Sequence, residues 1–504
     1  MKQLFALLLL IVLLGCDSSN TSHQKTSKPN IVFLFADDMT YHAVRSLGNM
    51  EIHTPNLDRL VNGGTTFTHA YNMGGWHGAV CVASRTMLMS GKSLWRSRES
   101  ETAWRDRDSL ALQQSWGKIM SRNGYNTYMS GKWHVAAPAD IVFELARHVR
   151  PGMPPDSWRT RSEEQKEAIA NYRSNGVDLK TVMPNGYHRP NDKNDDSWSP
   201  SDTSKGGFWK GGKHWSEVLK DDALDYIADA SSRDLPFFMY LAFNAPHDPR
   251  QAPQEFVDMY QQEALTAPVN WLPEYPYKDD MGNGPGLRDE ALAPYPRTEY
   301  AIQTHIKEYY AIITHLDAQI GKILDALEQS GKMDNTYVFF SADHGLSVGN
   351  HGLIGKQNMY DHSVRVPLMM MGPGVPAGQQ VASDVYLQDI MATSLDLAGI
   401  DKPDFVEFNS LLPQAQGKTT NGSYDAIYGA YIDLQRMVRK DGFKLIVYPK
   451  INRLRLFDLT KDPKEMNDLA EDPAYAEKVQ QLLAELRQLQ EEFGDQLDLS
   501  GLGS

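Results

Sequence analysis

Cys81 is a residue whose neighbours suggest covalent chemistry. It follows a glycine-containing loop and begins a short helical pattern that ends near Gly91. A cysteine at a helix N-terminus lies where backbone N–H groups and the helix dipole favour an anion. Arg85, four residues later on the same helix face, adds a fixed positive charge. A lone cysteine is also often a small buried hydrophobe, so this pattern by itself leaves both interpretations open.

Side chains that bind metals or move protons follow four apolar runs, at residues 31–36, 127–130, 237–243 and 337–342. Ligands of open α/β sheets bind beyond the carboxyl ends of the strands, so we expect these side chains to share one edge of a sheet. The residues that follow the runs are Asp37, Asp38, Lys132, His134, His247, Asp343 and His344.

The elements that must position these residues form an α/β fold. Continuous hydrophobicity in the four runs indicates strands buried on both faces, and hence a large, mostly parallel sheet flanked by helices. Thr54-Pro55 and Gly63-Gly64 are typical start and stop signals of one helix. Apolar residues at helical spacing predict a longer helix over 298–329.

The pattern changes from about Tyr424, where short alternating segments at 443–448 and 454–459 predict a small antiparallel sheet. A final amphipathic helix should start at Asp472-Pro473 and pack on that sheet. We therefore expect a catalytic unit over residues 29–410 and a small C-terminal sheet with a helix over 411–504.

The stretch Cys81-Val82-Ala83-Ser84-Arg85 resembles the type I sulfatase signature, in which the cysteine is oxidised to formylglycine (3-oxoalanine). The resemblance runs from about residue 29 to 470. It keeps the order Asp-Asp, C-x-A-S-R, Gly-Lys-x-His, a Pro-His segment, Asp-His-Gly and a distant Lys. It implies the alkaline-phosphatase-like sulfatase fold and the activity of a sulfuric ester hydrolase.

The resemblance also implies roles for residues at the matching positions. Cys81 would become the formylglycine nucleophile, supported by Arg85. A metal would be held by Asp37, Asp38, Cys81, Asp343 and His344. Such oxygen-rich ligands suit a hard divalent cation, with Ca²⁺ expected and Mg²⁺ possible. His344 departs from the Asn that many members have, which makes ligation by this side chain less secure.

Four further residues match positions that hold sulfate or move protons: Lys132, His134, His247 and Lys356. Cations beside the nucleophile would screen the charge of the sulfate oxygens. We assign the base to His134 and protonation of the leaving group to His247, with help from Lys356. The order of the two histidines stays open.

Substrate contacts are expected from the loops around this core, because loops vary while the scaffold stays constant. Residues 140–215 contain clusters of Arg, Trp and Lys, and Arg250 follows His247 closely enough to be expected at the pocket rim. The candidate substrate-binding residues are Arg250, Trp209 and His214. Aromatic faces and cations suit a sulfated saccharide, although a solvated insertion with buried aromatics explains the 140–215 region equally well.

The N-terminus predicts export. Lys2 and an apolar run from residue 4 to 14 form a secretory signal that is too short to span a bilayer. Leu13-Leu14-Gly15-Cys16 resembles a bacterial lipobox, which implies lipidation of Cys16 and a lipid membrane as a partner. Residues 1–16 would be the signal and residues 17–28 a flexible tether, leaving an exported, lipid-anchored protein on the periplasmic side or the cell surface.

Composition excludes several classes of function. The formal net charge of −14 argues against nucleic-acid binding, which needs a basic face. The two cysteines form no CxxC pair, which excludes zinc ribbons and disulfide scaffolds. One oxygen-rich metal set, rather than two His/Asp sets, argues against a two-zinc phosphatase.

The resemblance implies a carbohydrate sulfatase that takes sulfate from an oligo- or polysaccharide, with a formylglycine-generating enzyme as a partner. Algal material such as ulvan, carrageenan or fucoidan is the expected source, and host glycosaminoglycan fragments and choline sulfate stay open as other substrates. Two alternatives stay open. One is a phosphonate monoester or phosphodiester hydrolase of the same superfamily, and the other is a glycan-binding lipoprotein in which Cys81 is never oxidised.

Overall fold

A computed structural model describes residues 28–154, 161–171, 176–177, 181–182, 189–293 and 295–502. The predicted signal, Cys16 and tether residues 17–27 lie outside these ranges. Within them, no helix has the length and apolarity that a membrane span requires.

A nine-stranded sheet forms the centre of the described chain, in the order β10-β2-β9-β7-β1-β6-β4-β5, with β8 pairing β2. The five pairings β1/β6, β1/β7, β4/β6, β4/β5 and β2/β10 are parallel, whereas β9 runs antiparallel to β2 and β7. The sheet is therefore mixed, and the strands that were predicted to be parallel lie at its centre. Its strands are β1 (Asn30–Ala36), β2 (Thr65–Tyr71), β4 (Asn126–Lys132), β5 (Leu145–Arg150), β6 (Phe237–Ala242), β7 (Thr336–Ala342), β8 (Arg365–Val366), β9 (Leu368–Met371) and β10 (Gln379–Tyr386).

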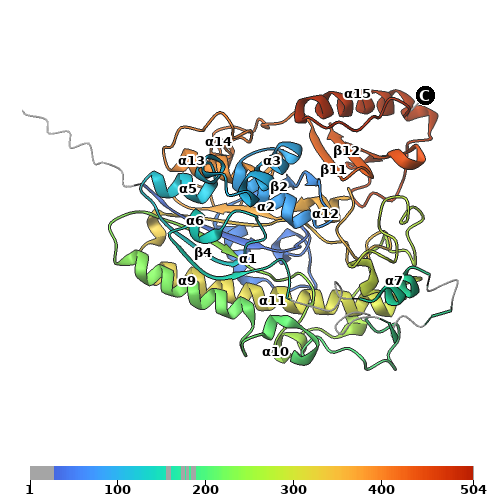
Figure 1. The fold of residues 1–504 in the computed structure, drawn as a ribbon, viewed down its shortest axis with the longest axis horizontal. Coiled ribbons are helices and arrows are strands. Elements are labelled where there is room, and N and C mark those ends of the chain that lie inside the picture. Colours follow the sequence, from blue (N-terminus) through green and yellow to red (C-terminus); the bar gives the residue numbers. More distant parts are fainter. Residues whose placement is uncertain are drawn as a thin grey trace, which may run out of the picture.

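Helices cover both faces of this sheet, which explains why β1, β4, β6 and β7 are buried along their whole length. Figure 1 shows α9 and the long α11 below the sheet, and α2, α5 and α13 above it. The helices are α1 (Pro55–Gly63), α2 (Val80–Ser90), α3 (Leu94–Arg105), α4 (Ser109–Gln113), α5 (Trp116–Arg122), α6 (Ala139–Val142), α7 (Glu163–Ala170), α9 (Trp215–Ser231), α10 (Gln254–Val257), α11 (Glu299–Gln329), α12 (Asp361–Val364), α13 (Asp389–Leu397), α14 (Leu412–Ala415) and α15 (Ala476–Phe493). Thr54 and Thr298 are the N-cap residues of α1 and α11, as the start signals predicted.

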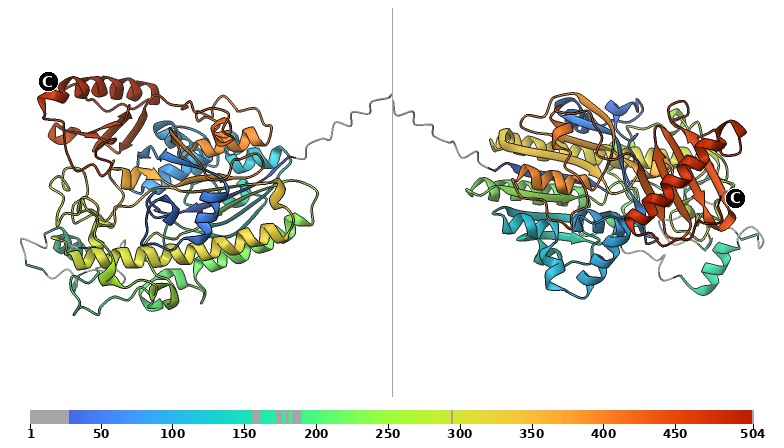
Figure 2. Two further views of the ribbon diagram at one scale, coloured as in Figure 1. Left: turned by 180° about the vertical axis from the view of Figure 1, so that it is seen from behind. Right: turned by 90° about the horizontal axis from the view of Figure 1, so that it is seen from above.

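A second, five-stranded sheet lies beside the first, with α15 along it (Figure 2). Its order is β14-β13-β12-β11-β3, and its long strands are antiparallel, as predicted. The short β3 comes from the N-terminal half of the chain and pairs with β11 in parallel. The strands are β3 (Gly74–Gly75), β11 (Ile427–Tyr431), β12 (Gln435–Lys440), β13 (Phe443–Tyr448) and β14 (Arg453–Asp458).

Helix α2 lies between two hydrophobic cores. Its residues Val80, Ala83 and Met87 pack in the core of the small sheet, whereas Leu88 and Met89 pack in the core of the large sheet. Gly91 ends the helix with a φ of 70°, a left-handed conformation that glycine adopts without steric cost. Both sheets thus fix the position of Cys81 at the start of this helix.

Candidate active site

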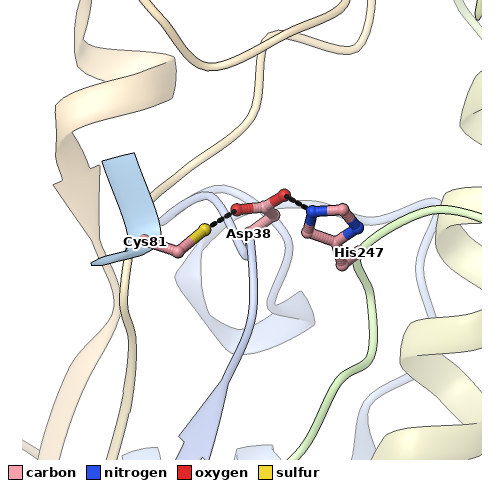
Figure 3. A group of neighbouring side chains, drawn as sticks. All are labelled: Asp38, Cys81 and His247. Carbon is pink, nitrogen blue, oxygen red and sulfur yellow. Dashed lines mark hydrogen bonds and ion pairs between the residues drawn. The ribbon is translucent and has the colours of Figure 1, made fainter. Parts of the chain in front are cut away.

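Cys81 and three carboxylates meet at the carboxyl ends of the central strands. One donor atom each from Asp37, Asp38, Cys81 and Asp343 can be chosen so that all four lie within 4.8 Å of one another, and all four residues are buried. Cys81 Sγ is 3.5 Å from Asp37 Oδ1 and 3.6 Å from Asp38 Oδ1. Figure 3 shows Asp38 between Cys81 and His247. The structure therefore brings together residues from β1, α2 and β7 that the sequence pattern placed at one edge.

Local backbone geometry sets how the carboxylates point. Asp38 has a φ of 67°, a left-handed conformation that is uncommon for a residue other than glycine. Its backbone N–H donates to Asp343 Oδ1 at 3.1 Å, and the Tyr309 hydroxyl donates to its carbonyl at 2.7 Å. Contacts from β7 and α11 thus hold the loop after β1 in this conformation.

Three buried cations surround the acidic group. Lys132 Nζ lies 2.5 Å from Asp37 Oδ2, and Arg85 Nε donates to Asp343 Oδ2 at 2.8 Å. Lys356 Nζ lies 2.6 Å from Asp38 Oδ1 and 3.0 Å from Cys81 Sγ. Of these three cations, Lys356 from a distant loop contacts Cys81 directly, whereas Arg85 and Lys132 contact the carboxylates beside it.

The pKa values of the three carboxyl groups are shifted in different directions. Burial and the charge of Asp343 raise the pKa of Asp37 well above its ordinary value. Burial also raises the pKa of Asp38, although Lys356 opposes the shift. Burial acts against ionisation of Asp343 too, but Arg85, Lys132 and Lys356 outweigh it and hold the pKa of this carboxyl below its usual range. Asp37 and Asp38 would be stabilised in their ionised form by a further cation.

The two predicted proton-transfer histidines lie on different loops. His247 Nε2 is 3.7 Å from Asp38 Oδ2, and its Nδ1 donates to the Asp248 carbonyl at 2.8 Å. His134 has a φ of 57°, and its Nδ1 is buried without a hydrogen-bond partner. Burial lowers the pKa of both imidazoles, with Lys356 adding to the shift at His247 and Lys132 at His134. Both rings are therefore neutral at neutral pH.

His344 is fully buried beside Asp343, but its side chain does not belong to the group of donor atoms around Cys81. Its Nδ1 contacts the Gly345 carbonyl at 3.3 Å, and its Nε2 has no hydrogen-bond partner. Ligation of a metal by His344 stays a prediction.

The contacts described for the three expected substrate residues are made with neighbouring elements rather than with Cys81 and its carboxylates. Arg250, expected at a rim, is 1% exposed because its Nη1 donates to Glu308 Oε1 on α11 at 2.9 Å. His214 is buried and caps α9 by accepting from the Ser216 N–H. Trp209 packs edge-on against His214. Trp158 and Arg159, in the same predicted region, lie outside the described residues.

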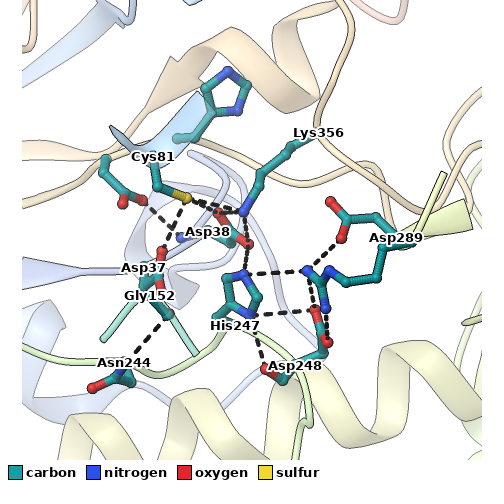
Figure 4. A network of polar contacts seen from close by, with 12 residues as sticks. Asp37, Asp38, Cys81, Gly152, Asn244, His247, Asp248, Asp289 and Lys356 are labelled. Atoms are coloured by element: carbon teal, nitrogen blue, oxygen red, sulfur yellow. Dashed lines mark hydrogen bonds and ion pairs between the residues drawn. The ribbon is translucent and has the colours of Figure 1, made fainter. Parts of the chain in front are cut away.

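Sequence reasoning did not identify a network that joins the His247 and Lys356 loops. Arg288 donates to Asp248, at 3.1 Å for Oδ1, and its Nη2 lies 3.4 Å from His247 Nε2. Arg288 also pairs with Asp289, which accepts from Gln357 Nε2 at 2.9 Å. Figure 4 shows Asp248 and Asp289 on the side of His247 away from Cys81. Arg288 lies in a Pro- and Gly-rich stretch with no motif or periodicity, so no local signal marks it.

Two family models and several known proteins are similar to this chain in sequence. Residues 29–400 match the family model described as Sulfatase, and residues 349–492 match the one described as N-sulphoglucosamine sulphohydrolase, C-terminal. The arylsulfatase of Clostridium perfringens is 28% identical over 90% of this chain and 93% of its own length. The N-acetylglucosamine-6-O-sulfatase of Bacteroides thetaiotaomicron is 25% identical, with 95% and 89% covered. The ulvan-active sulfatase of Formosa agariphila is 26% identical, with 97% and 87% covered.

Two solved structures share the fold. One protein, in complex with its substrate D-glucosamine-2-N,6-O-disulfate, has a TM-score of 0.69 at 22% identity and covers 93% of this chain and 99% of its own. The phosphonate monoester hydrolase of Agrobacterium radiobacter has a TM-score of 0.66 at 20% identity, with 92% and 96% covered. Because both classes of enzyme share the architecture, the fold does not distinguish sulfur from phosphorus chemistry.

Proposed function

The chain belongs to the sulfatase family and is a sulfuric ester hydrolase, and we propose that it removes sulfate esters from sulfated saccharides through a nucleophile made from Cys81. The observation that carries this proposal is the position of Cys81 at the start of α2, 3.0 Å from Lys356 Nζ and beside three carboxylates. Related sulfatases that act on N-acetylglucosamine-6-O-sulfate and on ulvan support a saccharide substrate, with algal polysaccharide as one source.

The surroundings of Cys81 favour an oxidised residue over a thiolate. Burial and the charge of Asp343 raise the pKa of the Cys81 thiol well above its ordinary value, so the unmodified side chain is protonated at neutral pH. A protonated thiol is a poor nucleophile. Conversion to formylglycine would supply an oxygen nucleophile at the same position. It would also replace a soft sulfur by an oxygen beside the carboxylates.

The carboxylates fit a divalent cation. Asp37, Asp38 and Asp343 offer the oxygen ligands that Ca²⁺ and Mg²⁺ prefer. Burial, together with the charge of Asp343, raises the pKa values of Asp37 and Asp38, and a nearby cation would oppose both shifts. A bound cation would supply positive charge to a sulfate oxygen and to residue 81. The identity of the ion, with Ca²⁺ expected, is part of the proposal.

The side chains around residue 81 then have separate tasks. Lys132, Lys356 and Arg85 are buried cations that screen the charge of a sulfate group. His134, neutral and with an unpartnered Nδ1, serves as the base. His247 carries a proton to the leaving sugar oxygen, with Lys356 as a second donor within reach of the nucleophile. Export and lipid attachment at Cys16 remain predictions from the N-terminal sequence.

Replacement of the nucleophile tests the proposal. Cys81→Ala should keep the wild-type melting temperature and lose at least about 1000-fold in sulfate release from sulfated oligosaccharides, because no covalent route remains. Peptide mass spectrometry of the wild-type protein from its native host should show the aldehyde at residue 81. Full activity of the Ala variant would refute the assignment. An unmodified thiol throughout would favour a glycan-binding protein, and faster release from an aryl phosphodiester would favour the phosphorus hydrolase.

A further inference from the structure

A cavity of about 400 Å³ is lined by His134 and by Val82, the residue that follows Cys81 in the chain. It lies between α2, α3 and the loop that follows β4, and its lining includes Val82, Glu101, Trp104, Arg105, Arg107 and His134. Val82 is the neighbour of Cys81 in the chain, and His134 follows Lys132 by two residues. The cavity therefore borders the nucleophile helix on one side and the proposed base on the other.

The walls of this cavity are fixed by one carboxylate. Glu101 Oε2, from α3, accepts from Thr86 Oγ1 on α2 at 3.2 Å and from the Ala136 N–H of the His134 loop at 3.1 Å. Its other oxygen lies 3.4 Å from Arg105 Nη2. Because Glu101 joins all three segments and is 7% exposed, the cavity is a built feature of the fold.

Two arginines and one carboxylate line the cavity, so the charged groups of its lining sum to a positive charge. The Arg105 side chain is 72% exposed, and its pairing partner Glu101 is already engaged with α2 and the His134 loop. Within the part of the chain that the structure describes, the Arg107 guanidinium forms no ion pair or hydrogen bond. A larger cavity of about 620 Å³ lies elsewhere, around Thr40, Tyr310 and Val348, and is lined by none of the predicted catalytic residues.

We propose that the cavity beside His134 is a second anionic subsite, in which Arg107 and Arg105 bind a sulfate or carboxylate group of the saccharide whose sulfate ester lies at residue 81. This inference rests on the proposed function. Guanidinium groups bind both kinds of oxyanion through paired N–H donors, so the two anions share one recognition chemistry. The preferred substrate is then a sugar or disaccharide with at least two anionic groups rather than an isolated sulfate ester.

A binding experiment separates this inference from the catalytic proposal. Dissociation constants of the full-length Cys81→Ala protein should be measured by calorimetry for N-acetylglucosamine-6-O-sulfate, for glucosamine-2-N,6-O-disulfate, and for a 6-O-sulfated disaccharide that contains a uronate. We expect the doubly anionic ligands to bind at least about tenfold more tightly, as one charge-assisted Arg contact provides. The disulfated and the uronate-containing ligands distinguish a sulfate subsite from a carboxylate subsite.

Two variants in the same background make the test specific. Arg107 has a φ of 59°, so Arg107→Asn removes the charge with a residue that tolerates the left-handed conformation. This variant should lose most of the preference for two anionic groups. Arg98→Gln, an exposed arginine on α3 that does not line the cavity, should keep it. Equal dissociation constants for singly and doubly anionic ligands would contradict the proposed subsite. Tighter binding of the doubly anionic ligands that is unchanged in Arg107→Asn would contradict it as well. If that preference is found but the wild-type enzyme releases no sulfate from saccharides, the proposed function fails while the subsite stands.

Discussion

His247 and Lys356 differ in how readily each can give up a proton in this site. Burial and Lys356 lower the pKa of His247, whereas the carboxylate of Asp38 raises that of Lys356 against the effect of burial. The Nδ1–H of His247 is engaged by the Asp248 carbonyl at 2.8 Å, so Nε2 is the ring atom that faces Asp38 and Arg288. In the neutral ring Nε2 therefore carries no proton, so His247 can deliver one to the leaving group from Nε2 only after this atom has taken up a proton.

The leaving group distinguishes the two donors. A sugar alkoxide needs protonation as it leaves, whereas a nitrophenolate does not. His247→Gln should therefore lower kcat/KM on a sulfated sugar by about 100-fold and on nitrophenyl sulfate by about tenfold or less. Steady-state kinetics on both substrates check this, with His53→Gln, an exposed histidine, as the control. Equal losses on both substrates would assign the proton to another group.

Metal removal tests the three carboxylates without relying on activity. A chelator should lower the Tm of the wild-type protein by several degrees, because a ligand at 100 times its Kd stabilises the folded state by about 2.7 kcal/mol. Added Ca²⁺ should restore the Tm. Asp343→Asn should abolish this response, whereas Asp433→Asn, in an exposed ion pair with Lys450, should keep it. A wild-type Tm that changes with neither the chelator nor added Ca²⁺ would contradict a structural role for the ion.

At the scale of secondary structure elements, the loop after β5 holds the proposed base in place. Gly152 follows β5, and a Cβ atom on this residue would lie 2.3 Å from His134 Cε1. Its carbonyl accepts from Asn244 Nδ2, at the end of β6, at 3.4 Å (Figure 4). The Gly152 backbone therefore packs closely against the His134 ring, and Asn244 contacts that backbone from the loop after β6.

Gly152→Ala should displace the His134 ring and lower kcat by about 10- to 100-fold, because small misplacements of a catalytic group are costly. The melting temperature should change little, since the loop can shift. Gly286→Ala is the matched control, because no atom lies within 4 Å of the added Cβ. Kinetics and a Tm measurement on both variants check the prediction, and an unaltered kcat for Gly152→Ala would remove His134 from the mechanism.

At the scale of the whole molecule, a buried charge cluster joins the small sheet to the loop that carries Lys356. Lys444 of β13 pairs with Asp361 of α12 and, at 2.7 Å, with Glu465 Oε1. The Asp361 N–H donates to Glu465 Oε2 at 2.8 Å. Burial and the charge of Asp361 raise the pKa of Glu465 to about 7, although Lys444 opposes the shift.

This shift predicts a pH dependence of stability. The folded state keeps the Glu465 proton between pH 4.5 and about 7, whereas the unfolded chain has lost it, so stability falls as pH rises through this window. The full effect, reached above pH 7, is about 3 kcal/mol by the value of one pKa unit. Glu465→Gln removes the titration, so its Tm relative to wild type should rise between pH 5 and pH 8. A constant difference in Tm across this range would contradict the prediction, and Glu471→Gln, in an exposed pair, is the control.

The sequence by itself predicted the central strands, the long helices and most of the side chains that meet around Cys81. These residues follow buried apolar runs or a short contiguous motif, and local patterns report such features directly. The nucleophile signature, the paired aspartates and Asp343 were all identified in this way. Their meeting at one sheet edge follows from the parallel arrangement of the strands that carry them.

Only the tertiary structure decided which loops complete the site. Arg288, Gly152 and Arg107 lie in stretches without periodicity, and their roles depend on segments far away in the chain. Arg250 shows the converse, because its neighbour His247 suggested a pocket residue while Glu308 on α11 holds it in the interior. Contacts between distant segments leave no local pattern, since burial and charge pairing are set by packing rather than by spacing along the chain.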